Sequence, residues 1–499
     1  MGGTSVSERS EHTIGLDVGT TGVKGLLVAA DGRVVAGAAR EYPLLTPQPG
    51  WTEQEPVDWW RAAVEVLREL AGRADGSIAA LGLTGQMHGS VFLDADGRPI
   101  RPALLWNDQR TADECADIEQ RVGSARLREL TGNPALTGFQ APKILWLRRH
   151  EPEAYGRVRH VLLPKDYVCH ELTGTFATDA SDAAGTLLLD LRRRDWSSEV
   201  LDALDIPAVW LPEVFEGPEV TGHLAEAVAH GLGLPAGLPV VAGGGDNAAA
   251  AVGCGVIREG TGFVSLGTSG VVFAHSDAPR IDPDGALHAF CHAVPGAYHL
   301  MGVVLSAGGA LRWHRDTVAP GTDYARLVDE AAHVPPGADG LTFLPYLAGE
   351  RTPHMDPDAR AAWIGLSLAH ERRHMTRAVL EGVAFALADS VERMRALGVE
   401  LDTLYAVGGG ARSDAWRAIV AAAARVRLQR LAAEEGPAMG AAILAMVGAG
   451  LYPDVAAAVT ATVRPVGEPQ APDPDLVDAY RGPYARYRAL FPALRSIGD

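Results

Sequence analysis

The stretch Asp17-Val18-Gly19-Thr20-Thr21-Gly22-Val23 stands between two apolar runs, residues 14–16 and 23–30, and the chain turns again at Asp31-Gly32. We interpret this region as a meander of strands joined by tight turns. In the first turn two glycines allow close approach of the backbone, and two hydroxyl groups can bind an anion. A carboxylate beside a phosphate cradle is typical of a site with a divalent cation between them. The alternative is an ordinary hairpin with an aspartate at its mouth.

The same turn recurs as Ser265-Leu266-Gly267-Thr268-Ser269-Gly270-Val271. Gly19 and Gly267 are 248 positions apart, about half of the 499-residue chain. This repeat predicts two related domains that face one ligand. Ser265 takes the place of Asp17, so only the first copy would supply a carboxylate to a metal ion.

Composition narrows the function classes. With 47% hydrophobic and 21% charged residues, the chain is typical of a soluble globular protein, and no apolar run is long enough to span a bilayer. The net charge of −18 argues against nucleic acid or an anionic membrane as partner. Four scattered cysteines indicate a reducing cytoplasm and no structural zinc. Residues 1–12 are polar and are expected to form a disordered tail.

Two polar clusters end apolar segments in the first half. A helix is expected from an N-cap at Asp58, and a strand at 78–83 then leads to Gln86-Met87-His88, while Trp106-Asn107-Asp108 follows a second strand pair. Amide, imidazole and aromatic groups beside glycines suit a hydroxyl-rich ligand. The alternatives are Met87 as core filler, His88 as a histidine satisfied at a strand end, and Asp108 in a salt bridge to Arg110 or to another surface charge.

A third cluster, Gly243-Gly244-Gly245-Asp246-Asn247, lies between a strand and a helix of small residues. Asp246 could serve as the N-cap of that helix. The glycines, however, allow another backbone or a ligand to come close, and a helix N-terminus favours an ionised carboxylate, as a proton acceptor must be.

In the second half of the chain, glycines again follow the ends of predicted strands. A strand at 298–305 leads to a helix opened by Gly308-Gly309, and a strand at 404–407 ends in Gly408-Gly409-Gly410 before a helix at 415–424. Such strand–glycine–helix units are typical of nucleotide sites, although close helix–strand packing also uses glycine. A long amphipathic helix is predicted at 370–397.

In this order the motifs resemble the FGGY carbohydrate kinases over residues 14–450. They are the two threonine turns, Gln86-Met87-His88-Gly89, Trp106-Asn107-Asp108, Gly243-to-Asn247, Gly349-Glu350-Arg351-Thr352-Pro353-His354, Gly408-Gly409-Gly410 and Gly436-Pro437-Ala438. Met87-His88 together with the 349–354 motif is most similar to the members that phosphorylate xylulose. Gln140 departs from the family's first signature, where a small residue or proline is usual.

This resemblance implies an α/β fold of two ribonuclease H-like, actin-type ATPase domains around a central cleft that closes on the sugar. The implied units are an N-terminal domain at 13–256, a C-terminal domain at 257–465 and a helical extension at 466–499. The implied ligands are a sugar, ATP and Mg²⁺. The oligomeric state is left open, with a homodimer as one option.

The resemblance also implies roles for individual residues. Asp246 corresponds to the catalytic base, and Asp17 with Asp246 to the magnesium site. The implied sugar-binding residues are Gln86, Met87, His88, Trp106, Asn107, Asp108, Asp246 and Asn247. The implied nucleotide-binding residues are Gly19, Thr20, Thr21, Lys24, Gly267, Thr268, Ser269, Gly308, Gly409, Gly410 and Asp414.

Alternative functions remain within and outside this family. Within it, the substrate would be ribulose, glycerol or a deoxysugar. Outside it, an actin- or chaperone-like ATPase would turn over nucleotide without sugar, but would leave the clusters around Met87 and Trp106 without a role. A dinucleotide-dependent dehydrogenase is disfavoured because no Gly-x-Gly-x-x-Gly follows the first strand.

Overall fold

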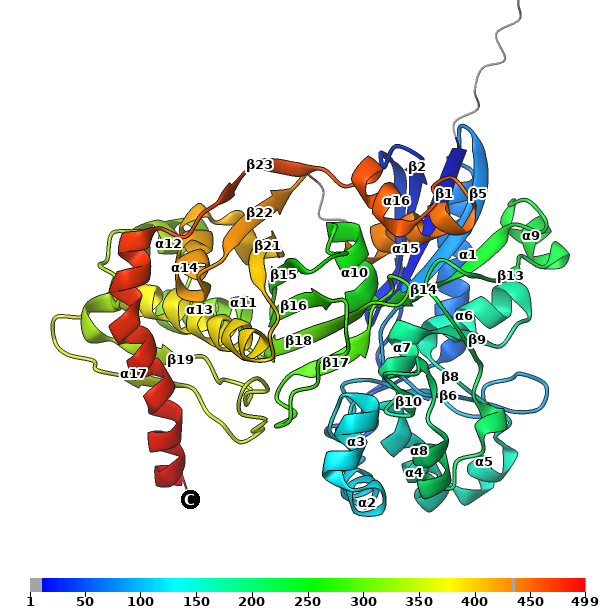
Figure 1. Cartoon of the computed structure of the whole chain (residues 1–499), viewed down its shortest axis with the longest axis horizontal. Coiled ribbons are helices and arrows are strands. Elements are labelled where there is room, and N and C mark those ends of the chain that lie inside the picture. Colours follow the sequence, from blue (N-terminus) through cyan, green and yellow to red (C-terminus); the bar gives the residue numbers. More distant parts are fainter. Residues whose placement is uncertain (1–10, 433–435, 499) are drawn as a thin grey trace, which may run out of the picture.

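The structure is a computed structural model that describes residues 11–432 and 436–498. Two lobes, each built on one large mixed sheet with helices packed on it, lie side by side (Figure 1). The predicted tail, residues 1–12, falls mostly outside the described residues, but Glu11 and His12 belong to the first strand rather than to a tail.

The N-terminal sheet has the strand order β13-β14-β5-β1-β2-β3. β1 pairs antiparallel with β2 across the first threonine turn and parallel with β5 on its other side. Ile14 and Leu16 face one side of β1, and Gly15 on the other side lets a later helix come close, so both faces are covered and nearly all of the strand is buried. The strands are β1 Glu11–Val18, β2 Gly22–Ala29, β3 Val34–Glu41, β5 Ser77–Gly85, β13 Val220–His223 and β14 Pro239–Gly245.

The C-terminal sheet has the strand order β17-β18-β16-β15-β21-β22-β23. β15 pairs antiparallel with β16 across the second threonine turn and parallel with β21. The strands are β15 Gly260–Leu266, β16 Gly270–Ser276, β17 His288–Cys291, β18 Tyr298–Val304, β21 Leu401–Val407, β22 Arg427–Leu431 and β23 Pro465–Gln470.

The two sheets repeat one pattern. In each, a threonine hairpin lies at the centre, a parallel strand flanks its first arm, and an antiparallel strand flanks its second arm. A further parallel strand and an antiparallel edge strand complete the match, β14 with β13 in one lobe and β22 with β23 in the other. The prediction of two related α/β domains is confirmed.

Helices pack on the sheets through the apolar faces that the sequence pattern predicts. The helix α1 (Pro56–Ala71) buries Trp59, Val66 and Leu70, but it begins at Pro56 and its N-cap is Glu55, so the prediction of Asp58 as N-cap was wrong. Proline suits the first helical position because its missing N–H would have no partner there. The predicted helix at 370–397 is α13 (Arg372–Ala396). The other C-lobe elements are α11 Gly308–Val318, α12 Tyr324–Ala332, η2 Ala338–Gly340, β19 Thr342–Leu344, β20 Ala362–Ile364, η3 Gly409–Arg412, α14 Asp414–Ala424 and α17 Pro474–Gly498.

A group of short elements between β5 and β14 forms the outer part of the N-terminal lobe, and β4 Glu53–Gln54 joins it through β7. Its helices are α2 Ala112–Val122, α3 Ser124–Thr131, α4 Gln140–His150, α5 Pro152–Arg157, α6 Pro164–Thr173, α7 Ala180–Ala184, α8 Ser198–Leu204, η1 Ala208–Trp210 and α9 Glu226–Leu232. Its strands are β6 Val91–Leu93, β7 Ala103–Leu104, β8 His160–Leu162, β9 Ala177–Asp179, β10 Leu189–Asp190, β11 Asp195–Trp196 and β12 Glu213–Phe215.

Two helices that follow the C-terminal strand β22 in sequence pack on the N-terminal lobe. The helices α15 (Gly436–Gly448) and α16 (Val455–Thr462) lie beside β1 and β2 in Figure 1 and share a buried core with α10 (Asp246–Cys254). The backbones come very close, because a Cβ atom at Gly15 would lie 1.8 Å from the Ala438 carbonyl oxygen. The side chain of Thr13 adds a hydrogen bond, in which Oγ1 donates to Ala442 O at 3.1 Å. The predicted division at residue 256 stays a prediction, but residues 436–462 do not pack as part of the C-terminal sheet.

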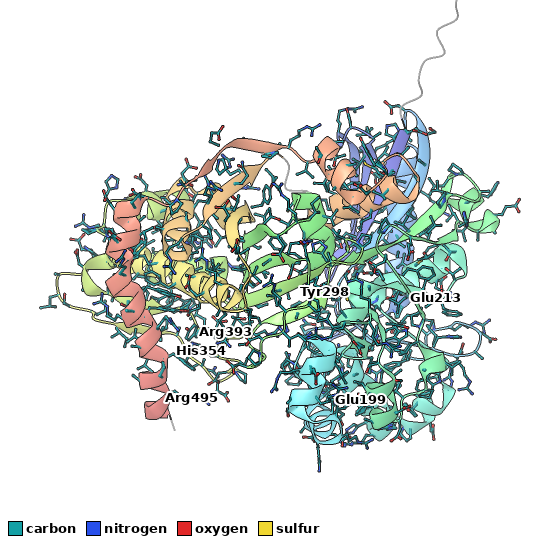
Figure 2. The ribbon with its side chains drawn as sticks, in the orientation of Figure 1. Glu199, Glu213, Tyr298, His354, Arg393 and Arg495 are labelled. Atoms are coloured by element: carbon teal, nitrogen blue, oxygen red, sulfur yellow. The ribbon has the colours of Figure 1, made fainter. Side chains whose placement is uncertain are left out.

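The lobes also touch directly. Figure 2 places Tyr298 at their junction, and Arg194 of the N-terminal lobe lies over its ring at 5.3 Å. Arg194 Nη1 donates to Ala297 O at 2.6 Å. Within the described residues, no helix is both long enough and apolar enough to span a bilayer.

Candidate functional site

The first threonine turn is held by side chains from three segments. Gly19 N donates to Gly22 O at 3.1 Å and closes the turn. Gln54 Nε2 donates to Thr20 O at 2.7 Å, and Gln86 Nε2 donates to Gln54 Oε1 at 3.0 Å. Gln86 therefore stands behind the turn and supports its shape, rather than lining the cavity where a sugar would bind.

Asp17 carries the features of a cation ligand. Its Oδ1 atom is buried and has no hydrogen-bond partner among the described residues. Burial, followed by the negative charge of Asp246, raises the pKa of Asp17 to about 7, while Lys24 acts in the opposite direction. A divalent cation between the two carboxylates would remove this repulsion. In the described part of the chain no three metal-ligating side chains gather, so phosphate oxygens would have to complete the coordination, as is usual for Mg²⁺.

Asp246 is the first residue of α10, directly after the N-cap Gly245. The suggestion that Asp246 serves as N-cap is wrong: its Oδ1 instead accepts from Asn247 N at 2.6 Å and Asn247 Nδ2 at 2.9 Å. Burial raises the pKa of Asp246 to about 6 and outweighs these hydrogen bonds, which lower it. The expected help of the helix N-terminus is therefore only partial, but the carboxylate is still mostly ionised at neutral pH.

The glycines before Asp246 admit protein groups. Gly243 has φ of 76°, and a Cβ there would lie 1.6 Å from Leu83 O. A Cβ at Gly245 would lie 2.9 Å from Met87 Cγ. Two of the glycines thus let the strand β5 and the side chain of Met87 approach β14 closely, which places Met87 beside the backbone that leads to Asp246.

A buried ionic cluster lies behind this strand and was missed by the sequence reasoning. Lys165 Nζ lies 2.6 Å from Asp166 Oδ1 and 2.7 Å from Asp179 Oδ2, and all three side chains are at most 2% exposed. Asp179 accepts hydrogen bonds from Ser181, whose Oγ accepts from Gly245 N at 3.1 Å. The cluster thereby fixes the backbone that carries Asp246. Lys165 and Asp166 alone give no sign of the cluster in the sequence, because Asp179 and Asp182 come from a later segment.

A cavity of about 330 Å³, here called the sugar cavity, lies between the lobes. Of the predicted sugar-binding residues it contains Met87, His88, Trp106, Asp246 and Asn247. The remaining residues that line it are Leu136, Gly138, Phe139, Ser265, Ser269, Val271, His288, Phe290, Met301, Val303 and Arg351.

Two other predicted sugar-binding residues are occupied elsewhere. Asn107 Oδ1 accepts from Thr52 Oγ1 at 2.7 Å. Asp108 is fully buried, accepts from Thr52 N at 2.7 Å and pairs with Arg110 Nη2 at 2.7 Å. The structure favours the ion pair with Arg110 over a direct sugar contact for Asp108. Trp106, in contrast, lines the cavity and donates from Nε1 to Thr20 Oγ1 at 2.9 Å.

Two neutral histidines line the sugar cavity. Burial lowers the pKa of His88 to about 3 and that of His288 well below its usual range, and the charge of Arg351 acts in the same direction on both. His88 Nδ1 donates to Gly185 O at 2.6 Å, and His288 Nδ1 donates to Asn133 Oδ1 at 2.8 Å. Each ring therefore keeps Nε2 as a hydrogen-bond acceptor.

A larger cavity of about 730 Å³, here called the nucleotide cavity, lies within the C-terminal lobe. It includes five predicted nucleotide residues: Gly267, Thr268, Gly308, Gly409 and Gly410. The other residues that line it include Arg312, Tyr324, Asp329, Arg412, Ser413 and Trp416. Gly308 N donates to Gly267 O at 2.7 Å, and a Cβ at Gly308 would clash with that oxygen at 2.5 Å. Glycine is therefore required where the helix α11 meets the turn.

The other predicted nucleotide residues lie outside this cavity. Ser269 lines the sugar cavity, and Asp414 pairs with Arg417 at the surface. Gly19, Thr20 and Thr21 belong to the N-terminal turn, Lys24 lies in the strand β2, and none of the four lines either cavity. Their predicted contact with phosphate stays a prediction.

A third cavity of about 310 Å³ joins the two sites. It shares Asp246, Asn247, Ser265 and Val271 with the sugar cavity, and its Gly408 precedes Gly409 of the nucleotide cavity. Asp246 thus lies between the place for a hydroxyl-rich ligand and the glycines that suit a phosphate chain.

Comparison with known proteins agrees with this geometry. The N- and C-terminal domain models of the FGGY family of carbohydrate kinases match residues 12–253 and 262–449. Xylulose kinase from Escherichia coli strain K12 is 43% identical over 96% of this chain and 99% of its own length, and xylulose kinase from Lactococcus lactis is 41% identical over 96% of each chain. A crystal structure of xylulose kinase from Rhodospirillum rubrum has a TM-score of 0.92 at 35% identity, over 97% of this chain and 99% of its own. The chain belongs to the FGGY family of carbohydrate kinases.

Proposed function

We propose that the protein transfers the γ-phosphoryl group of ATP to D-xylulose and forms D-xylulose 5-phosphate. The position of Asp246, between the sugar cavity and the third cavity that leads to Gly408, carries this proposal. The relatives named xylulose kinase, which match over nearly the whole chain, support the choice of sugar.

Asp246 acts as general base. Its carboxylate accepts the proton of the C5 hydroxyl as that oxygen bonds to the γ-phosphorus, and the bond from this phosphorus to the β–γ bridging oxygen breaks to release ADP. Asn247 holds the carboxylate in place through two hydrogen bonds to the same oxygen atom. Met87 packs against the backbone before the base, so the base has little freedom to turn away.

Phosphoryl transfer asks the protein mainly for alignment and for neutralisation of charge. The backbone N–H groups of the two threonine turns are suited to hold phosphate oxygens, and Arg312, which donates to Thr268 Oγ1 at 3.4 Å, adds a positive charge to the nucleotide cavity.

Asp17 and Asp246 are the residues that would hold Mg²⁺, and the unpartnered Oδ1 of Asp17 fits this role. When bound, the cation neutralises charge on the phosphate oxygens. The four cysteines form no disulfide, in keeping with a location in the reducing cytoplasm.

The test is ATP consumption by the purified protein with D-xylulose, D-ribulose, glycerol or no sugar, measured with a coupled ADP assay. We expect turnover that depends on D-xylulose and exceeds that with D-ribulose or glycerol. Preference for another sugar would refute the substrate but keep the sugar kinase activity. Equal turnover with and without sugar would favour an actin- or chaperone-like ATPase instead.

A further inference from the structure

Arg351 has a role in the sugar cavity that the motif around it does not explain. It lies between Gly349 and His354, and His354 turns away from the cavity to stack on Phe491 at 4.0 Å. Figure 2 shows His354 beside Arg393 in the lower part of the C-terminal lobe. Arg351 alone of residues 349–354 lines the sugar cavity.

The guanidinium of Arg351 has no ion-pair partner among the residues that the structure describes. Its neighbour Glu350 uses Oε1 to accept from Leu305 N at 2.9 Å and Arg351 N at 2.8 Å. Burial raises the pKa of Glu350 to about 8, so at neutral pH this carboxyl group is mostly protonated and does not neutralise the arginine. A partly buried cation without an anion favours a ligand that brings hydrogen-bond acceptors to it.

Arg351 stands at the opposite end of the sugar cavity from Asp246. Ser265 pairs with Val271, Val271 pairs with Val303, and Val303 N donates to Thr352 Oγ1 at 3.0 Å. These residues therefore form a row across the sheet. Neighbouring strands are about 4.8 Å apart, so Thr352 lies roughly 14 Å from Ser265. Asp246 shares the third cavity with Ser265 and Val271, a cavity that reaches neither Val303 nor Arg351.

This arrangement places different binding groups at the two ends of a linear sugar. With the C5 hydroxyl at Asp246, the C1–C2 end of a ketopentose points toward Arg351. A guanidinium only donates, and its parallel N–H groups match the two in-plane lone pairs of a ketone oxygen. A hydroxyl oxygen at C2 can also accept, but it stands on a tetrahedral carbon, out of the plane in which the ketone oxygen presents both lone pairs to the two N–H groups. The acceptors Nε2 of His88 and His288 are suited to the hydroxyl groups beside the ketone.

We propose that Arg351 binds the carbonyl end of the substrate and determines the preference for a ketose over the polyol with the same carbon chain. This inference rests on the proposed function, because it takes the C5 hydroxyl as the group placed at Asp246. Arg351 is a binding residue in this account and takes no part in the proton transfer.

The test compares Arg351→Met with the native enzyme on two ligands. These are D-xylulose as substrate and xylitol as competitive inhibitor against D-xylulose. We expect KM for D-xylulose to rise about 30- to 100-fold in the variant, the size expected for loss of a hydrogen bond to a charged group. Its kcat, its KM for ATP and its Ki for xylitol should each change by less than about threefold. Arg351→Lys keeps the charge without the paired N–H groups and should give an intermediate KM.

Arg360→Met is the matched control. Arg360 lies nine positions further along the chain, is 65% exposed, and lines none of the three cavities, so this variant should keep native values for both ligands. A parallel loss of D-xylulose and xylitol binding in Arg351→Met, or no change in either, would overturn the proposal. If Arg351→Met does not fold, the test is the change in KM for D-xylulose relative to the change in Ki for xylitol, measured for Arg351→Lys. Failure of the proposed function would instead appear in the native enzyme, as lack of turnover with D-xylulose.

Discussion

Removal of the buried cation Lys165 should destabilise the N-terminal lobe strongly. The variant Lys165→Met keeps a side chain of similar length but leaves Asp166, Asp179 and Asp182 buried together without a positive charge. Lys165 is itself held in its charged form, because these carboxylates raise its pKa well above the usual range against the effect of burial.

The size of the effect follows from the loss of one partner in a buried ion cluster, which costs about 3–5 kcal/mol. For a lobe of 150–250 residues, each kcal/mol lowers Tm by about 2–4 °C, so the variant should melt roughly 6–20 °C below the native enzyme. Because Asp179 also accepts from Ser181, whose Oγ holds Gly245 N, kcat should fall even below the melting range.

The measurement is thermal unfolding followed by circular dichroism at pH 8 and pH 5. Burial raises the pKa of Asp166 and of Asp182, and loss of the lysine charge in the variant raises both further above the unfolded value, so their destabilisation is greatest at high pH and is relieved as the pH falls. The difference in Tm from the native enzyme should therefore shrink at pH 5. The control Arg98→Met removes an exposed ion pair and should change stability by less than about 1 kcal/mol. A Tm for Lys165→Met within 2 °C of native at pH 8 would refute the reasoning.

Three further predictions concern the base, a buried histidine and the contact between helices. Asp246→Asn should lower kcat by about 10²–10⁴-fold with little change in the binding of D-xylulose. In a pH series of the coupled assay, kcat/KM of the native enzyme should fall tenfold per pH unit below about pH 6, where Asp246 becomes protonated. His299, whose ring stacks on Phe273 at 4.2 Å and whose pKa is lowered to about 3 by burial, contributes stability above pH 6.5 that is lost as the pH falls. In urea unfolding, the free energy of unfolding of His299→Phe should therefore rise relative to that of the native enzyme by about 1.4 kcal/mol for each pH unit below pH 6.5. Gly440→Ala, with a Cβ 1.8 Å from Ala249 O, should push α15 away from α10 and lower both Tm and kcat.

These predictions have clear contrary outcomes. Native turnover by Asp246→Asn would remove this residue from the chemistry, and an identical pH dependence of stability in His299→Phe would show that His299 is protonated in the folded state. The control for Gly440→Ala is Gly156→Ala, where a Cβ would meet no atom within 4 Å. Equal Tm values for the two glycine variants would contradict the close contact between α10 and α15.

The main features of the fold could be predicted because they depend on local sequence patterns. The two threonine turns differ at one informative position, Asp17 against Ser265, and each lies between apolar runs that became a central hairpin. Gly308 and Gly410 were predicted as nucleotide-binding residues from the family resemblance and from glycines that follow strands, and both line the nucleotide cavity. Met87 and His88 were found because polar groups at strand ends are conspicuous after a buried strand.

Other parts of the site depend on tertiary contacts that leave no local pattern. His288 and Phe290 line the sugar cavity from a strand whose sequence resembles ordinary core. Asp108 was predicted as a sugar ligand because it stands with Trp106 and Asn107 in one cluster of aromatic and polar groups, yet Arg110 donates to both of its carboxylate oxygens. Arg351 stood in a quoted motif, but its position at the far end of the cavity follows only from the pairing of β18 with the segment at Thr352.

The packing of α15 on β1 and β5 has a consequence for biosynthesis. Residues 257–448 must leave the ribosome after the predicted end of the N-terminal domain before this helix can cover the apolar face of β1 and β5. At about 5–20 residues per second, these 192 residues take roughly 10–40 s to translate. During that interval the nascent chain exposes an unfinished sheet, so we expect newly made protein to associate with chaperones that bind apolar segments until translation passes Gly448.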